Sequence, residues 1–169
     1  MPAAAPDAVA AEVVAQLTAR GLTVATAESL TGGGVCAALT SVPGSSAVVR
    51  GGVVAYATDV KAALLGVDTE LLARVGPVHA DVALAMARGA AVLLGADLGV
   101  ACTGVAGPDS QGGHRPGTVY VARWGAAGAA TVPAVLALDL PGDRAAVRSA
   151  TVRAVLGLLL DLDPSAQRG

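Results

Sequence analysis

Phenylalanine is absent from this chain of 169 residues, which holds only one tryptophan and two tyrosines. Large aromatic side chains therefore cannot fill the interior. The core has to be built from alanine, valine and leucine, with helices and strands packed closely together. Hydrophobic residue types make up 54% of the sequence, and a chain of this length can bury one full core. We expect one domain over residues 1–169.

An excess of charge of one sign is also lacking. The net charge is −2, so nothing indicates a nucleic-acid surface or a membrane surface. No apolar run reaches the length of a membrane span, because glycines or charges interrupt the longest stretches. Residues 1–7 lack the basic and apolar regions of a signal peptide. We expect a cytoplasmic protein with no nucleic-acid partner and no membrane partner.

Disulfide and metal patterns are missing as well. The two cysteines, Cys36 and Cys102, stand in apolar company, and the sequence has no CxxC pair. No cluster of histidines and cysteines has the spacing of metal ligands. We expect both cysteines to be small buried core residues, with no metal and no cofactor.

Apolar spacing predicts helices and strands in alternation along the chain. Helices are expected at residues 8–20, 35–42, 58–65, 68–74, 79–95 and 143–160. Strands are expected at residues 22–26, 48–56, 98–103, 118–124 and 132–140. The last two are expected to pair antiparallel, and Pro133 indicates an edge strand or a strand start. The pattern predicts a three-layer α/β/α sandwich with a mixed, mostly parallel sheet of about five strands.

Polar groups crowd at the junction that follows the first expected strand. Glu28, Ser29 and Thr31 are followed by three glycines, beginning with Gly32 and Gly33, and then by a helix. In α/β sheets ligands bind at such junctions. Glycine amides and a helix N-terminus favour an anion or a developing oxyanion there. We expect this segment to face a ligand, the alternative being a helix cap with a tight glycine turn.

Two residue types in the chain fit nucleophilic catalysis. Ser29 and Thr31 are candidate nucleophiles, and Ser29 is the stronger one because a threonine next to Gly32 more naturally caps the helix. A G-x-S-x-G elbow is absent, so an α/β-hydrolase is not expected. Lys61 is the only lysine beside ten arginines, and a desolvated lysine can act as a base whereas arginine cannot. The sequence favours a Ser29–Lys61 pair, the alternative being a surface lysine retained by chance.

Thr103 and Gly104 end the third expected strand. If this strand lies beside the first one in parallel, Thr103 reaches the same edge of the sheet. Its hydroxyl is then placed to bind substrate or to relay a proton. The alternative is a turn residue at the end of a strand.

Three further patterns are weaker signals of a functional site. His79 stands at a helix start and is expected to be a surface or capping residue. His114 lies in a long loop rich in glycine and proline at residues 104–116, and such loops often carry function, although a solvated histidine is expected here. The segment Gly32-x-Gly34-x-x-Ala37 formally matches a dinucleotide fingerprint, but it starts too far after the strand for the usual tight turn.

Six segments in the same order resemble the CinA C-terminal domain family, over about residues 8–160. They are Thr26-Ala27-Glu28-Ser29-x-Thr31-Gly32-Gly33, Pro43-Gly44-Ser45-Ser46, Gly52-Val53-Val54-Ala55-Tyr56, Lys61-x-x-x-Leu65-Gly66-Val67, Gly104-x-Ala106-Gly107-Pro108 and Gly142-Asp143-Arg144. The resemblance implies a three-layer α/β/α fold and a nicotinamide-nucleotide amidase of pyridine-nucleotide salvage. Such an enzyme converts nicotinamide mononucleotide to nicotinic acid mononucleotide and ammonia without a metal.

The resemblance also implies roles for matching positions. Ser29 is the implied nucleophile and Lys61 its activating base. The implied surroundings of the substrate are Glu28, Thr31, Gly32, Gly33, Tyr56, Thr103 and Gly104. The sequence departs from the family pattern at Leu30, often a cysteine, at Ala57-Thr58, often Ser-Asn, and in a longer loop at residues 107–113.

The partner expected from these roles is a small nucleotide, with its phosphate against helix N-termini and an arginine that the sequence does not identify. A second hypothesis is a non-catalytic regulator that binds a nucleotide in the same crevice. The N-terminal domain fused to some family members has no counterpart here, so we expect a stand-alone amidase. An alanine-rich surface helix favours a homodimer.

Overall fold

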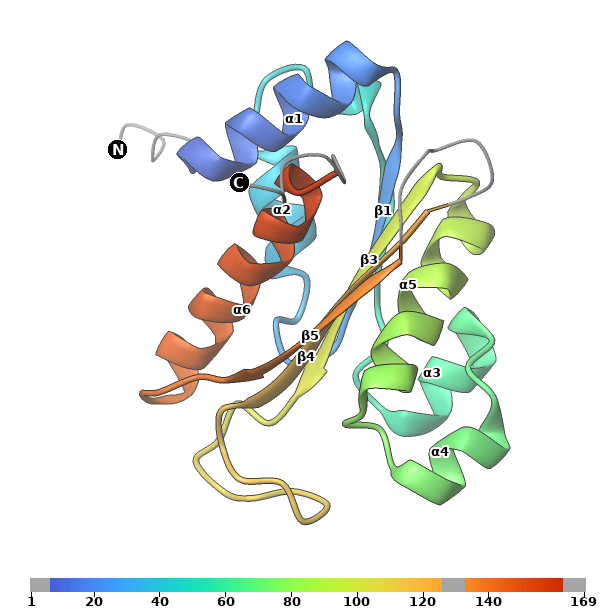
Figure 1. The fold of residues 1–169 in the computed structure, drawn as a ribbon, viewed down its shortest axis with the longest axis vertical. Coiled ribbons are helices and arrows are strands. Elements are labelled where there is room, and N and C mark those ends of the chain that lie inside the picture. The colour runs from blue at the N-terminus through green and yellow to red at the C-terminus, as the bar shows by residue number, and fades with distance from the viewer. Residues whose placement is uncertain (1–6, 126–132, 163–169) are drawn as a thin grey trace, which may run out of the picture.

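The computed structural model describes residues 7–125 and 133–162. Figure 1 shows the arrangement of its helices and strands. The helices are α1 (Ala8–Arg20), α2 (Gly34–Thr40), α3 (Thr58–Leu65), α4 (Thr69–Val75), α5 (Ala80–Leu94) and α6 (Arg144–Leu160), with a 3₁₀ turn, η1 (Ser45–Ala47). The strands are β1 (Val24–Glu28), β2 (Val49–Val54), β3 (Leu98–Gly104), β4 (Thr118–Gly125) and β5 (Ala134–Asp139).

The five strands form one sheet in the order β2-β1-β3-β4-β5. Strand β1 pairs in parallel with β2 and β3, and β4 runs antiparallel between β3 and β5. All strands except β4 therefore run in the same direction, which confirms the predicted mixed, mostly parallel sheet. β5 is an edge strand, as Pro133 indicated. Val132, which the prediction included in that strand, lies outside the described residues.

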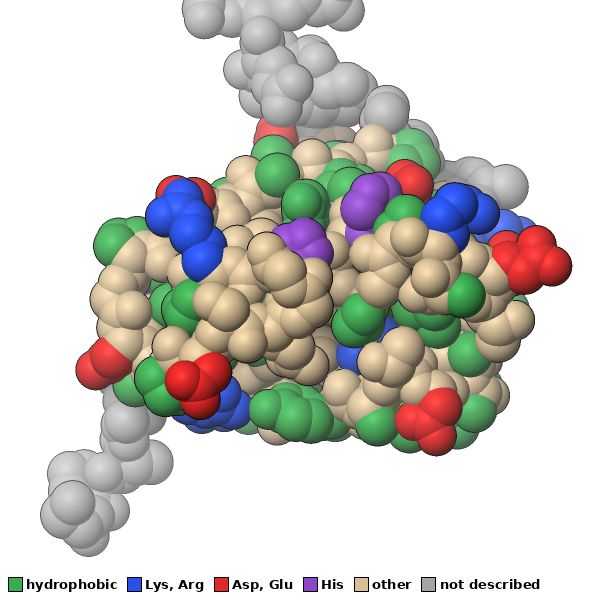
Figure 2. All heavy atoms as spheres, turned by 90° about the horizontal axis from the view of Figure 1, so that it is seen from below, with side chains coloured by type: hydrophobic (Ala, Val, Ile, Leu, Met, Phe, Trp, Pro, Cys, Tyr) green, Lys and Arg blue, Asp and Glu red, His purple; other side chains and the backbone are tan. Residues whose placement is uncertain are grey.

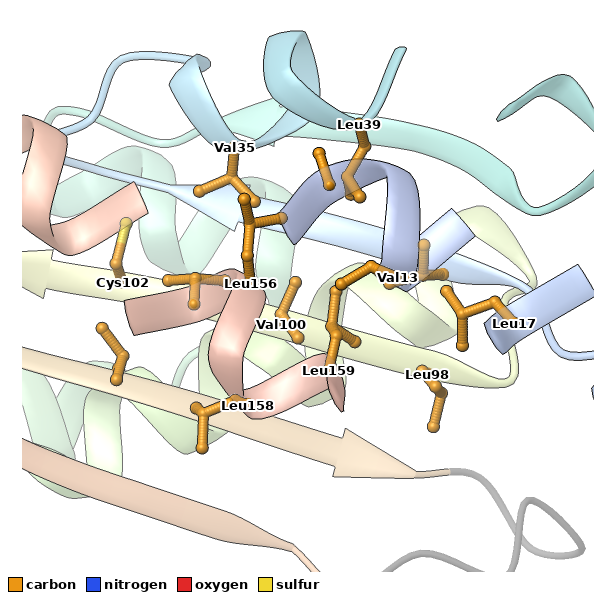
Figure 3. Packing of buried hydrophobic residues seen from close by; sticks show 14 of the residues in the cluster. Val13, Leu17, Val35, Leu39, Leu98, Val100, Cys102, Leu156, Leu158 and Leu159 are labelled. Carbon is orange, nitrogen blue, oxygen red and sulfur yellow. The ribbon is translucent and has the colours of Figure 1, made fainter. Parts of the chain in front are cut away.

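Helices cover both faces of the sheet and make the predicted three layers. In Figure 1, α1, α2 and α6 lie on one face, and α3, α4 and α5 lie on the other. Valines and leucines fill the first interface, including Val13, Leu39, Leu98 and Leu156 (Figure 3). Alanines dominate the second interface. There α5 approaches β3 so closely that a Cβ at Gly99 would lie 1.8 Å from the Ala87 carbonyl oxygen.

Local signals set the ends of several helices where they were predicted. The Asp7 carboxylate accepts a hydrogen bond from the Val9 amide at the start of α1, and Gly21, with φ 64°, ends that helix. His79 caps α5, since its Nδ1 accepts a hydrogen bond from the Asp81 amide. The prediction of a capping role for His79 is confirmed.

Both parallel strands at the first junction differ from their predicted bounds. β1 starts at Val24 rather than Leu22, because the Leu22 amide still donates to Leu17 O in the end of α1. β1 also ends two residues later than predicted, at Glu28. β2 ends at Val54 rather than Tyr56, because it is an edge strand and its pairing with β1 ends at Glu28 and Val54. Beyond that pair, the carbonyl oxygens of Ala55 and Tyr56 accept hydrogen bonds from Lys61 Nζ.

One smaller prediction also needs correction. Cys102 is fully buried, but Cys36 is only partly buried, so the expectation of a buried core residue is wrong for Cys36. Helix α3 starts at Thr58 as predicted, and its N-cap residue, Ala57, makes no side-chain hydrogen bond. None of the helices in the described ranges is both long enough and apolar enough to cross a bilayer.

Candidate active site

A cavity opens at the carboxyl end of β1 and β3, at the lower end of the molecule in Figure 1. This is the edge of an α/β sheet where ligands bind. Figure 2 shows the surface from that end, with charged side chains in separate spots rather than in one continuous patch. The cavity is lined by Ser29, Leu30, Tyr56, Thr58, Lys61, Pro77, Val78, Thr103, Gly104, Val105, Ala106, Gly107, Asp109, Gln111 and Arg144.

Ser29 and Lys61 meet in the wall of this cavity. Ser29 directly follows β1, and Lys61 lies near the start of α3. The distance from Lys61 Nζ to Ser29 Oγ is 3.1 Å. Lys61 is 1% exposed and Ser29 is 8% exposed. The two residues that the sequence paired across 32 positions are therefore in hydrogen-bond contact, shielded from bulk water.

Burial lowers the pKa of Lys61 from its ordinary value of 10.5 to about 8, while the nearby Cys102 thiol acts in the opposite direction. Nζ also donates to Ala55 O at 2.6 Å and to Tyr56 O at 3.3 Å. A neutral amine has two hydrogens and one lone pair. With the two hydrogens on these carbonyls, the lone pair is free to accept the hydroxyl proton of Ser29.

Glu28 lies behind this pair, with 1% of its surface exposed. Its carboxylate accepts hydrogen bonds from the hydroxyl of Thr31 at 2.6 Å and from that of Thr26 at 3.3 Å. It also accepts from the amides of Val35 and Cys36 at 2.9 and 2.8 Å. Glu28, and not Thr31, therefore caps α2, so the expected capping role of Thr31 is wrong.

The glycines of the junction shape the chain rather than line the cavity. Gly32 and Gly33 have φ angles of 61° and 101°, a region that favours glycine. The Gly32 amide donates a hydrogen bond to Ser29 O at 3.0 Å. This amide was expected to face an oxyanion, but its hydrogen is already bonded within the turn. The cavity lining includes Ser29 but not Glu28, Thr31, Gly32 or Gly33.

Thr103 and Gly104 reach the same cavity from β3. The condition for this placement was a parallel pairing of β1 and β3, and that pairing is present. Thr103 Oγ1 donates to Pro77 O at 2.7 Å, which ties the end of β3 to the segment before α5. Gly104 has no room for a side chain, since a Cβ would lie 2.6 Å from Thr118 O. Tyr56, 60% exposed, completes the group of predicted residues on the cavity wall.

Arg144 was missed as a site residue by the sequence reasoning. It is the first residue of α6 and lines the cavity. Its guanidinium donates to Gly107 O at 2.8 Å and to the Tyr56 hydroxyl at 3.0 Å. Part of the signal was present, because Arg144 closes the Gly142-Asp143-Arg144 motif and the phosphate was expected against helix N-termini and an unidentified arginine. The sequence alone could not select Arg144 among the ten arginines, because its place in the cavity depends on how α6 packs near Tyr56.

The other reactive residue types lie outside this arrangement. Burial raises the pKa of the Cys102 thiol to about 11, so this cysteine is not an activated nucleophile. His114 is not among the residues that line the cavity. Within residues 7–125 and 133–162, no three His, Cys, Asp or Glu side chains cluster as metal ligands.

The sequence of this chain is similar to those of known proteins. The family model described as the CinA C-terminal domain matches residues 6–162. A CinA-like protein of Frankia casuarinae is 45% identical over 155 residues, 92% of this chain and 35% of that protein. One of Geobacter sulfurreducens is 48% identical over 141 residues, 83% of this chain and 33% of that protein. The chain thus spans about a third of the length of these relatives.

Solved structures match over nearly their full length. The competence/damage inducible protein CihA from Agrobacterium tumefaciens is 39% identical, with a TM-score of 0.86 over 91% of this chain and 93% of that one. A CinA superfamily protein from Escherichia coli is 29% identical, with a TM-score of 0.87 over 96% of this chain and 93% of that one. These similarities confirm the fold that the sequence predicted.

Proposed function

This chain belongs to the family of CinA C-terminal domains, and on that premise we propose that it is a nicotinamide-nucleotide amidase. The reaction is hydrolysis of the carboxamide of nicotinamide mononucleotide to nicotinic acid mononucleotide and ammonia. The observation that carries the proposal is the buried contact of 3.1 Å between Lys61 Nζ and Ser29 Oγ at the wall of a cavity. A serine and a lysine of lowered pKa form a nucleophile and its base.

Acylation begins when Ser29 Oγ attacks the carboxamide carbon and its proton passes to Lys61 Nζ. The carbonyl oxygen becomes negatively charged in the tetrahedral intermediate. The lysine ammonium formed at the same moment stabilises this charge in surroundings from which water is largely excluded. The intermediate collapses when the carbon–nitrogen bond breaks and Lys61 returns the proton to the departing nitrogen. The products of this half are ammonia and an ester on Ser29.

Deacylation repeats these steps with water in place of ammonia. Lys61, neutral again, accepts a proton from a water molecule that attacks the ester carbon. The carbon–oxygen bond to Ser29 then breaks, and Lys61 returns the proton to Ser29 Oγ. The carboxylic acid product loses its proton to solvent. One water is consumed for each amide cleaved, and no metal enters the sequence of steps.

Arg144 is the candidate contact for the substrate phosphate. It projects from the N-terminus of α6, a 17-residue helix whose dipole also favours an anion there. Its guanidinium is held by Gly107 O and the Tyr56 hydroxyl, so a phosphate would replace neutral acceptors with a charged one. The exposed ring of Tyr56 offers a flat face for the pyridine ring.

Ammonia release by the purified protein tests the proposal. We expect turnover of nicotinamide mononucleotide with one nicotinic acid mononucleotide formed for each ammonia. Nicotinamide riboside, which lacks the phosphate, should show a KM at least about tenfold higher, because it loses a charge-assisted contact. Binding of the nucleotide without ammonia release would refute the amidase and favour the non-catalytic regulator.

A further inference from the structure

We infer that Arg148 is a positioning residue that holds the nucleophile in place from outside the cavity, together with Glu28 from inside the fold. The inference rests on the proposed role of Ser29. It concerns residues 29–33, which we call the Ser29 loop. This loop joins β1 to α2, and its conformation decides where Ser29 Oγ lies relative to Lys61.

The Ser29 loop cannot be rigid through its own sequence. Two of its five residues are glycines with positive φ, and glycine loses the most conformational freedom when it is ordered. Inside the turn, which the structure describes in full, there are only two backbone hydrogen bonds, from the Gly32 amide to Ser29 O and from the Gly34 amide to Thr31 O. These two bonds leave the Leu30 carbonyl and the side chains of the loop without a partner inside the turn. The loop therefore depends on ties to the rest of the molecule.

Arg148 supplies the outer tie from the second turn of α6. Its Nε donates to Leu30 O at 3.0 Å, and one of its terminal nitrogens donates to Thr31 O at 3.1 Å. A guanidinium is a planar fork, so binding two successive carbonyl oxygens fixes both peptide planes. The position of a Cβ on Gly32 would be 3.5 Å from the same guanidinium, which packs directly over the loop.

Glu28 supplies the inner tie. Its carboxylate holds the Thr31 hydroxyl and the first amides of α2, so it anchors both the middle of the loop and the helix that follows. The hydrogen bonds that Arg148 and Glu28 make to the Ser29 loop and α2 involve neither Ser29 Oγ nor Lys61 Nζ, and neither residue lines the cavity. Both therefore act on the reaction through the position of Ser29.

Amide hydrogen exchange of residues 29–36 tests the role of Arg148 without relying on turnover. Replacing Arg148 with methionine keeps an unbranched apolar side chain and removes both hydrogen bonds. We expect exchange in this segment to rise at least about fivefold. Arg148→Lys keeps the charge but not the fork, so its exchange should lie between the two. The matched control is Arg153→Met, because Arg153 is exposed on the same helix and donates to Ser149 Oγ.

Kinetics supply the second measurement. We expect Arg148→Met to lower kcat about tenfold or more with KM changed less than about threefold, because misplacement of Ser29 slows chemistry more than binding. Arg153→Met should match the wild type. Equal exchange in the two methionine variants, or a raised KM at unchanged kcat, would overturn the positioning role. Absence of ammonia release by the wild type would refute the proposed function instead, and exchange would still decide the role of Arg148.

Discussion

Lys61, the only lysine of the chain, is buried although its side chain can carry a charge. An ammonium group in this position loses most of its hydration, and its hydrogen-bond partners within the described residues include no carboxylate. Its partners are two carbonyl oxygens and a hydroxyl. Such surroundings keep the side chain in place while they favour its neutral form, which is the state a base requires.

Substitution of Lys61 separates a base from a simple charge. Arginine keeps the charge and much of the reach but does not lose its proton near neutral pH. We predict that Lys61→Arg is nearly as inactive as Lys61→Met, with kcat reduced at least about a hundredfold in both. Measurement of kcat and KM for the two variants checks this. If Lys61→Arg kept most of its activity with a modest rise in KM, Ser29 would take its base from elsewhere.

The lowered pKa of Lys61 predicts two pH dependences with the same origin. The kcat for ammonia release should rise with pH and reach half its maximum near pH 8, the pKa of Lys61. Between about pH 8 and 10.5 the unfolded state binds more protons at this site than the folded state, so stability should increase with pH across that window. Lys61→Met should lose this contribution to the pH dependence of the urea midpoint. A rate that is flat from pH 6.5 to 9 would contradict the base role.

At the residue scale, the contact between Ser29 and Lys61 could be predicted from the sequence, because the two residue types are chemically distinctive and Lys61 is the only lysine of the chain. The sequence could not tell which polar residues of the junction face the cavity. Glu28 and Thr31 stand close to Ser29 in sequence, yet the Thr31 hydroxyl donates to the Glu28 carboxylate, which also accepts from the first amides of α2. That outcome depends on a two-residue shift in the start of β1 and on the packing of α2, neither of which is encoded in local spacing.

At the scale of elements, caps and glycines allowed most boundaries to be predicted. The bounds of α1 and the edge position of β5 follow from Asp7, Gly21 and Pro133 through rules that act over a few residues. The end of β2 does not, because it depends on where the pairing with β1 ends, and the carbonyls of Ala55 and Tyr56 beyond that point bind Lys61 instead of a strand. A long-range contact of this kind has no local signal.

Two glycines inside helices provide a matched test of how closely the elements pack. Helix propensity alone favours alanine over glycine at both sites by about 1 kcal/mol. Gly157 of α6 meets no described atom within 4 Å of an added Cβ, so Gly157→Ala should stabilise the protein by about 0.5–1 kcal/mol. At Gly89 of α5 an added Cβ would lie 2.0 Å from Leu65 O, a backbone atom of α3. Gly89→Ala should therefore destabilise by about 1–3 kcal/mol.

Urea denaturation of the two alanine variants and the wild type measures these differences. The sign should be opposite for the two sites. A Gly89→Ala variant as stable as Gly157→Ala would show that α3 and α5 are less closely packed than the structure describes.

At the scale of the whole molecule, the sheet gathers the site from segments far apart in the sequence. Ser29 follows β1, Lys61 lies on α3, Thr103 ends β3 and Arg144 begins α6. The carboxyl ends of the parallel strands bring these segments to one edge. The fold class was predictable because alternating helices and strands leave few arrangements. The identity of Arg144 was not, because it depends on where α6 crosses that edge.

The potential metal-binding side chains of the described residues also predict how the proposed amidase activity responds to chelators. No three potential metal ligands lie together within the described ranges, and the proposed steps use a serine and a lysine. We predict that ammonia release is unchanged after dialysis against EDTA. Loss of activity on dialysis, with recovery on addition of a divalent ion, would refute the metal-free mechanism.

The central claim is that Ser29 forms a covalent bond to the substrate, and Ser29→Ala tests it most directly. The measurement is the rate of ammonia release from nicotinamide mononucleotide by the wild type and by this variant at equal protein concentration. We predict at least about a hundredfold lower rate for Ser29→Ala, with an unchanged Tm and retained nucleotide binding, because alanine removes only the nucleophilic hydroxyl. A Ser29→Ala protein that releases ammonia at the wild-type rate would contradict the central claim and direct attention to Thr31 or to a directly attacking water.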